Sequence, residues 1–368
     1  MNKKKNLTAE EHYFKAFESH KKNNLHSAEN SYKETLKLKP NHFEANYYLG
    51  GLLAQTKDFV SAKSLFEKII QLKPDFAEGH YNLAIILQEL GEYKKAVNSY
   101  EKAIEIQPHH LKTYNNLGAL LKQLNEKKKA IIYFEKAIQL KPDFVEGHYN
   151  IGVLFVEIGE HQKAINSFQK AIEINPNYSQ PYFNLGVMFQ ELGENQKAIN
   201  NYEKAIEINP NYAKAYNNAG VISQKLNNHQ KAISFYEKVI KIQPNYVDAH
   251  NNLGIAFKEI REYQKAIKCY QKAIQVGPDN ISIINSLSDL LKRIQLDKIP
   301  NINKESIKEL FLFLFRKNNV NHADLFKNAK LSLFTVESSD QIKKIINSNS
   351  LLLKNKNIQN LIKQELFL

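Results

Sequence analysis

The chain has 368 residues, 43% of them apolar, so it is long enough to bury a substantial core, and its formal net charge is +13. Only 13 glycines and 10 prolines argue against an all-β or linker-rich chain, and a single cysteine, Cys269, excludes an intramolecular disulfide framework. The most apolar stretch, residues 310–315, is far too short to span a membrane, and no apolar signal segment follows the N-terminus, so a cytoplasmic protein is expected.

Taken in chain order, the first feature is a basic start followed by a strict repeat. Residues 1–8 contain three lysines and are expected to form a flexible N-terminus. Prolines then recur every 34 residues, which indicates stacked supersecondary units. With proline at position 32, eight repeats span residues 9–280, and their first residues are Ala9, Phe43, Ala77, Leu111, Val145, Ser179, Ala213 and Val247.

Four positions of the repeat predict a helix pair. Position 20 is alanine and position 24 is aromatic in all eight repeats, while position 8 is glycine in all but two, which have Ala16 and Ala84. Small residues allow two helices to approach closely, and the aromatic residue is expected to fill the space between neighbouring repeats. Position 15 is glycine or asparagine except at Lys57 and Arg261, which suits a left-handed helix end. Each repeat is therefore predicted as two helices of about 13 residues.

Beyond residue 280 the period is lost. Residues 281–296 are predicted to form a capping helix, since Ile284, Leu287, Leu290 and Leu291 share one face. Residues 297–368 are predicted to form a small helical region, with helices at about 304–317, 321–333, 339–347 and 350–366.

This pattern resembles the tetratricopeptide repeat (TPR) family, whose motif has a small residue at position 8, alanine at 20, an aromatic residue at 24, a small residue at 27 and proline at 32. The tryptophan usual at position 4 is absent, and histidine, tyrosine or asparagine stands there. The resemblance implies an all-α, right-handed superhelical solenoid of helix-turn-helix repeats with a small helical C-terminal unit. The first helices of such a solenoid line a concave groove that binds extended polypeptides. The C-terminal quarter is loosely similar to the stretch before the transferase domain in some bacterial TPR proteins.

One position opposes helix propensity. Position 6 is asparagine in six successive repeats, although asparagine in mid-helix is less favourable than alanine by roughly 0.6 kcal/mol. These residues are Asn82, Asn116, Asn150, Asn184, Asn218 and Asn252. The resemblance places position 6 in the groove, where amides can hydrogen-bond a peptide backbone, and the row is similar to the asparagine ladder of peptide O-linked N-acetylglucosamine transferases. The alternative stays open that the row reflects recent duplication of one repeat in an asparagine-rich chain. Repeats one and two have Phe14 and Tyr48 instead.

No residue pattern indicates catalysis. The sequence has no glycine-rich cofactor loop, no P-loop, no His-Glu-x-x-His and no nucleophile elbow, so we expect no enzyme activity, catalytic residue or cofactor. The recurring position-4 histidines are expected to be too far apart to share a metal, and we interpret them as packing residues.

The charge is gathered at the ends: residues 1–8 carry +3, residues 281–368 carry +6, and the repeats carry only +4. That distribution disfavours a specific nucleic-acid partner. The sequence therefore predicts a protein- or peptide-binding scaffold. The alternative is a substrate-recruiting module of a glycosyl-, methyl- or sulfotransferase, truncated or acting with a separate catalytic partner. A third and weaker hypothesis is an electrostatic anchor that uses the basic ends.

Overall fold

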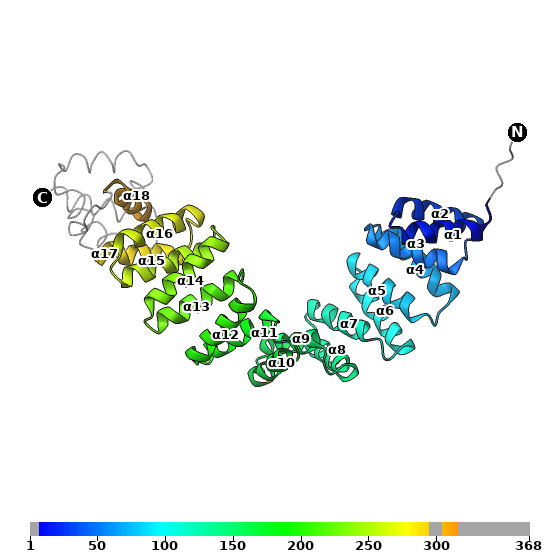
Figure 1. Cartoon of the computed structure of the whole chain (residues 1–368), viewed down its shortest axis with the longest axis horizontal. Coiled ribbons are helices and arrows are strands. Elements are labelled where there is room, and N and C mark those ends of the chain that lie inside the picture. Colours follow the sequence, from blue (N-terminus) through cyan, green and yellow to red (C-terminus); the bar gives the residue numbers. More distant parts are fainter. Residues whose placement is uncertain (1–6, 294–303, 316–368) are drawn as a thin grey trace. The chain divides into compact units, whose positions relative to one another are not determined.

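The computed structural model describes residues 7–293 and 304–315, and within them all regular secondary structure is α-helical (Figure 1). The chain divides into two compact units, residues 1–176 and 177–368. The helices of the first unit are α1 (Ala9–Lys21), α2 (Leu25–Leu38), α3 (Phe43–Gln55), α4 (Phe59–Leu72), α5 (Ala77–Glu89), α6 (Tyr93–Ile106), α7 (Leu111–Gln123), α8 (Lys127–Leu140), α9 (Val145–Glu157) and α10 (His161–Ile174). Those of the second unit are α11 (Ser179–Glu191), α12 (Asn195–Ile208), α13 (Ala213–Lys225), α14 (His229–Ile242), α15 (Val247–Glu259), α16 (Tyr263–Val276), α17 (Ile281–Arg293) and α18 (Lys304–Phe315).

The helices stack as pairs, so the prediction of an all-α fold built from helix-turn-helix repeats is confirmed. The odd-numbered helices α1 to α15 begin at the eight residues that the proline spacing placed at position 1. At the N-terminus, Thr8 is not part of a free extension. Its Oγ1 accepts a hydrogen bond from the Glu11 amide at 3.2 Å, and its own amide donates to Glu11 Oε2 at 2.7 Å. This capping box satisfies two amides at the start of α1.

The last helices extend the core of the second unit. Leu287, Leu290 and Leu291 of α17 are buried in one cluster with Tyr270 of α16. Phe311 and three further apolar residues of α18 belong to the same cluster. The helices predicted at 321–333, 339–347 and 350–366 lie outside the described residues.

Position 8 packs against position 24 of the same repeat. A Cβ added to Gly50 would lie 2.9 Å from Cε2 of Phe66, and one added to Gly152 would lie 2.6 Å from Cε1 of Phe168. The position-24 rings are Tyr32, Phe66, Tyr100, Phe134, Phe168, Tyr202, Tyr236 and Tyr270, and all are buried. The aromatic residue therefore fills the space within its own repeat first, whereas the sequence pattern placed it between repeats. Tyr32 does both, since it also stacks on Tyr48 of the next repeat at 6.2 Å between ring centroids.

Position 15 has a positive φ in every repeat. The residues are Asn23, Lys57, Gly91, Asn125, Gly159, Gly193, Asn227 and Arg261. The left-handed turn expected from glycine and asparagine is confirmed, and Lys57 (φ 67°) and Arg261 (φ 63°) adopt it as well. The turn geometry thus overrides the residue's own preference at these two sites, at a cost of roughly 1–2 kcal/mol each.

Gly50 and Gly51 are adjacent in α3 and test the packing argument. A Cβ at Gly51 would meet nothing within 4 Å, in contrast to Gly50. Gly51→Ala should raise the free energy of unfolding by roughly 0.5–1 kcal/mol, because alanine is the better helix former. Gly50→Val should lower it by roughly 1–3 kcal/mol through overpacking against Phe66. Urea titration followed by circular dichroism measures both; shifts in the same direction would contradict the steric explanation.

Arg261 tests the strain in the turn. Arg261→Gly should raise the free energy of unfolding by roughly 0.5–1 kcal/mol, because relief of the left-handed strain exceeds the entropy that glycine adds to the unfolded chain. Lys238, exposed inside α14, is the control, and Lys238→Gly should lower stability by about 1 kcal/mol. Equal losses from both changes would show that Arg261 is not strained.

Candidate functional site

The six predicted asparagines occupy equivalent places on six odd-numbered helices, α5 to α15. Every one of these side chains is half-buried. In each unit three of them form what we call the asparagine row: Asn82, Asn116 and Asn150 in the first unit, and Asn184, Asn218 and Asn252 in the second. The row is therefore partly exposed and also takes part in packing.

Hydrogen bonds tie members of the row to the preceding repeat. Asn116 Nδ2 donates to the Tyr81 hydroxyl at 3.1 Å, and Asn252 Nδ2 donates to Asn217 Oδ1 at 3.4 Å. Asn82 is hydrogen-bonded to the Tyr47 hydroxyl. In all three cases the partner stands at position 5 of the preceding repeat. These amides hold neighbouring repeats together, a role that the sequence analysis missed.

Asn218 is held by the position-24 ring of the preceding repeat. Its Nδ2 donates to the Tyr202 hydroxyl at 3.3 Å, and that hydroxyl donates to Gln190 Oε1 at 2.8 Å. Burial raises the pKa of Tyr202 to about 12, so the hydroxyl stays protonated at neutral pH and remains a donor. Tyr100 and Tyr236 make the same bond to Gln88 and Gln224 at position 12, at 3.4 and 3.1 Å.

A pattern in the sequence could have revealed this network. Repeats with tyrosine at position 24 have a hydrogen-bonding residue at position 12: His20, Gln88, Gln190, Gln224 and Lys258. Two of the three repeats with phenylalanine have Ala54 and Val156 there instead, and the third has Lys122. Lys258 is the exception among the tyrosine repeats, because it pairs with Asp289 at 2.9 Å, and the buried Tyr270 hydroxyl has no hydrogen-bond partner among the described residues.

The position-4 histidines also do more than pack. His80, His148 and His250 each lie within hydrogen-bonding distance of the proline carbonyl that precedes their own helix, at 2.9, 2.9 and 2.8 Å from Nε2. Each histidine thus fixes the turn between two repeats. In the described part of the chain no group of three His, Cys, Asp or Glu side chains is placed to hold a metal ion. Burial raises the pKa of the Cys269 thiol to about 12, so its thiolate is scarce at neutral pH.

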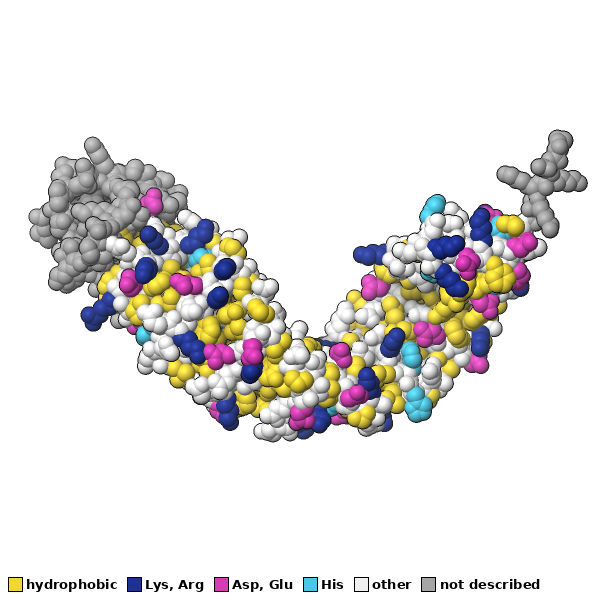
Figure 2. All heavy atoms as spheres, viewed as in Figure 1, with side chains coloured by type: hydrophobic (Ala, Val, Ile, Leu, Met, Phe, Trp, Pro, Cys, Tyr) yellow, Lys and Arg dark blue, Asp and Glu magenta, His cyan; other side chains and the backbone are white. Residues whose placement is uncertain are grey.

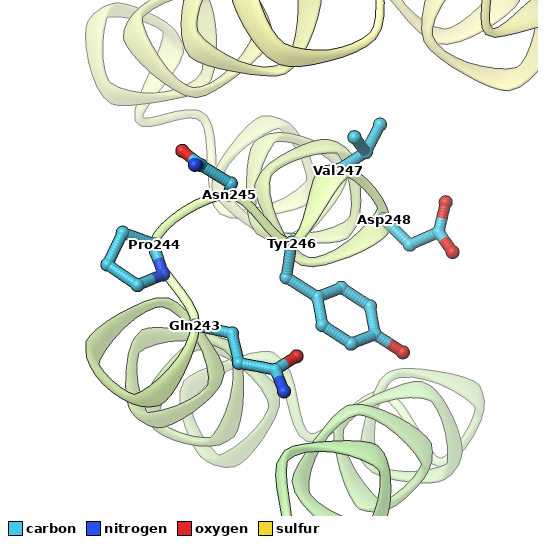
Figure 3. A pocket seen from close by; sticks show the side chains of 6 residues that line it. All are labelled: Gln243, Pro244, Asn245, Tyr246, Val247 and Asp248. Carbon is cyan, nitrogen blue, oxygen red and sulfur yellow. The ribbon is translucent and has the colours of Figure 1, made fainter.

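The turn between α14 and α15 contains a hollow of about 550 Å³, lined by six consecutive residues, 243–248 (Figure 3). Figure 3 shows the Tyr246 and Gln243 side chains on one side of the turn and the Asn245 side chain pointing away from them. Phenylalanine or tyrosine also stands two places after the proline at Phe76, Phe144, Tyr178 and Tyr212. We assign no function to the hollow.

Charge is mixed on the one face of the described residues that Figure 2 shows. Figure 2 shows acidic and basic side chains interspersed on the visible face, without a stripe of one sign. Among the described helices, none is both long enough and apolar enough to cross a membrane.

These stacked helix pairs define an all-α helical repeat protein, and the comparison with family models is specific. Models described as tetratricopeptide repeat match residues 21–77, 75–143, 145–178, 167–200, 213–246 and 247–280, and one described as TPR repeat matches residues 188–227. Together they cover well over half of the chain. The chain belongs to the tetratricopeptide repeat family.

Solved structures similar to this chain are also TPR proteins, and the first of those named here agrees with the fold. The C-terminal part of a TPR repeat-containing protein from Cytophaga hutchinsonii has a TM-score of 0.57 at 19% identity, with 66% of this chain and 99% of that chain covered. A TPR protein from Parabacteroides merdae has a TM-score of 0.49 at 18% identity, with coverage of 68% and 98%. YrrB, described as a TPR protein with an unusual peptide-binding site, has a TM-score of 0.46 at 24% identity, with coverage of 51% and 96%. No curated protein matches the chain.

The bond between Tyr202 and Gln190 can be measured by a double-mutant cycle. Tyr202→Phe and Gln190→Met should each lower the free energy of unfolding by roughly 0.5–1.5 kcal/mol, because each removes the same hydrogen bond. The double variant should lose less free energy of unfolding than the sum of the losses in the two single variants. Tyr202→Phe combined with Gln196→Met, on the exposed side of α12, is the control and should be additive. Additivity in both pairs would show that the Tyr202–Gln190 bond contributes nothing.

Proposed function

We propose that this chain is a protein-binding scaffold that holds extended polypeptides along the asparagine row. Proteins of the tetratricopeptide repeat family consist of repeats that stack into extended helical surfaces, and such surfaces suit polypeptide ligands. In this chain the row is the one feature of the odd-numbered helices that repeats with identical chemistry, in three successive repeats of each unit.

The observation that carries the proposal is the anchoring of the amides. A primary amide has two N–H donors and two acceptor lone pairs. Asn116 bonds to the Tyr81 and Tyr100 hydroxyls and Asn252 donates to Asn217, so these bonds use donors of the amide and leave its acceptor oxygen for a ligand. The orientation of each half-buried amide is thereby fixed. A ligand that binds such pre-oriented groups loses less conformational entropy, which favours affinity.

The spacing and chemistry of the row favour a peptide backbone over other ligands. Each repeat presents one amide, and a peptide backbone offers one donor and one acceptor for each non-proline residue. The low net charge of the repeats and the mixed charge on the face that Figure 2 shows favour neither nucleic acid nor a strongly charged partner. Recruitment of a substrate for a separate transferase, the alternative function, would use the same row to hold that substrate.

The test uses two matched triple variants. Wild-type chain is used to select binders from a phage-displayed library of random dodecapeptides. Replacement of Asn82, Asn116 and Asn150, the three members of the row in the first unit, by alanine should weaken binding of a selected peptide roughly tenfold to a hundredfold, since two or three hydrogen bonds are lost. Fluorescence polarisation with the labelled peptide measures the change in affinity.

The control triple replaces Asn30, Asn98 and Asn166 by alanine. These asparagines lie in the same unit but are exposed on the even-numbered helices α2, α6 and α10. The control should leave affinity within about twofold of wild type. Thermal melts of both variants check that the stack is intact, because Asn82 also bonds to Tyr47. Equal affinity of the two variants for the peptide, or failure to select any peptide, would refute the proposal.

A further inference from the structure

A pocket of about 410 Å³ lies across the first three repeats. His20 of α1, Gly51 and two tyrosines of α3, and Ile85 and Ile86 of α5 are among its lining residues, so all three odd-numbered helices contribute to it. Its volume falls in the range of pockets that bury a side chain or small ligand. It lies at the end of the first unit's asparagine row, and Asn82 forms part of its wall.

Gly51 creates the space. It stands at position 9, where the other seven repeats have Phe17, Ile85, Ala119, Val153, Val187, Val221 and Ile255. Gly51 is helical, exposed, and has no atom within 4 Å of where its Cβ would be, so packing does not require glycine there. Glycine inside a helix nevertheless destabilises it relative to alanine. A glycine at this place leaves the pocket open, since Gly51 is one of its lining residues.

Ring contacts hold the walls in place. Tyr47 lies edge-on to Tyr48 and to Phe66, with ring centroids 5.4 and 6.0 Å apart. Tyr48 in turn stacks on the buried ring of Tyr32, and His20 lies edge-on to Tyr48 at 6.2 Å. A pocket with fixed aromatic and aliphatic walls can accept an apolar side chain without reorganisation.

The rim is polar and acidic. Glu78 is the one carboxylate in the lining, and no lysine or arginine is part of it. The Glu78 side chain is 39% exposed and lies 3.7 Å from His110 Nε2, so it has room for a cation. Next to it, Asn82 is held by its hydrogen bond to the Tyr47 hydroxyl.

We infer that this pocket recognises a short element of a peptide, a large apolar residue next to a lysine or arginine. The apolar side chain enters the pocket beside Gly51, and the basic side chain reaches Glu78. The inference rests on the proposed function, because the peptide backbone continues from the pocket along Asn82, Asn116 and Asn150. The aliphatic walls from Ile85, Ile86 and Ala54 favour an apolar group in the pocket itself, and the carboxylate at the rim favours a cation beside it.

The experiment compares peptides selected from random dodecapeptide phage libraries on the wild-type chain and on Gly51→Ile. Peptides selected on the wild type are expected to share an apolar residue next to lysine or arginine. Gly51→Ile places an isoleucine side chain in the pocket, and the fold accepts isoleucine at position 9 in two other repeats, at Ile85 and Ile255. The substitution should lower the affinity for such a peptide about tenfold or more. Glu78→Gln should lower the affinity for the peptide by a smaller factor, and only when the peptide retains its basic residue.

The matched control is Ser64→Ile, which adds the same side chain at an exposed place on α4 of the same repeat. It should leave affinity within about twofold of wild type. If selected peptides lose affinity in the triple alanine variant of the asparagine row but not in Gly51→Ile, the pocket inference is wrong and the proposed function stands. If the library yields no binders on the wild type, both fail. Selected peptides without the apolar–basic pair also overturn the inference.

Discussion

The contact between a helical glycine and an aromatic ring sets the distance between the two helices of most repeats. Because Gly152 has no Cβ, the Phe168 ring lies directly against its helix, and the same holds for Gly50 and Phe66. Where the ring belongs to tyrosine, this close approach brings its hydroxyl to the odd-numbered helices, within reach of position 12. Tyr202 shows the result, since it links Gln190 of its own repeat to Asn218 of the next. This polar link between two repeats therefore depends on the apolar contact between Gly186 and Tyr202 inside one repeat.

The sequence was sufficient to predict the helix pairs because local sterics decide them. Proline ends the second helix, and the turn after the first helix needs a positive φ. Lys57 and Arg261 show that the stacked fold imposes this φ even on residues that resist it. Six repeats with a favourable residue at position 15 were enough to place the turn in all eight. The order of small and aromatic positions then required the two helices to pack closely.

The site could be predicted only in part, because hydrogen-bond partners are set by contacts between repeats. Helix propensity singled out position 6, yet it does not show that Asn116 is tied to Tyr81, 35 residues earlier. Gly50 and Gly51 show the same limit, since two identical neighbours in α3 have opposite surroundings. One lies against a buried ring and the other faces open space. Only the arrangement of side chains around each residue separates a structural role from a binding role.

In the first unit, the face of the odd-numbered helices changes character along the chain. Repeats one and two have the aromatic residues Phe14 and Tyr48 at position 6, and Tyr48 lines the pocket beside Gly51. Repeats three to five have the asparagine row at the same position. Amides that bind a backbone do not by themselves fix which residue of a peptide meets which repeat, because every peptide unit offers the same groups. A side-chain pocket at one end removes that degeneracy, since one anchored residue sets the register for all that follow. The aromatic repeats would thus supply selectivity, and the asparagine repeats would supply affinity that grows with the length of the bound segment.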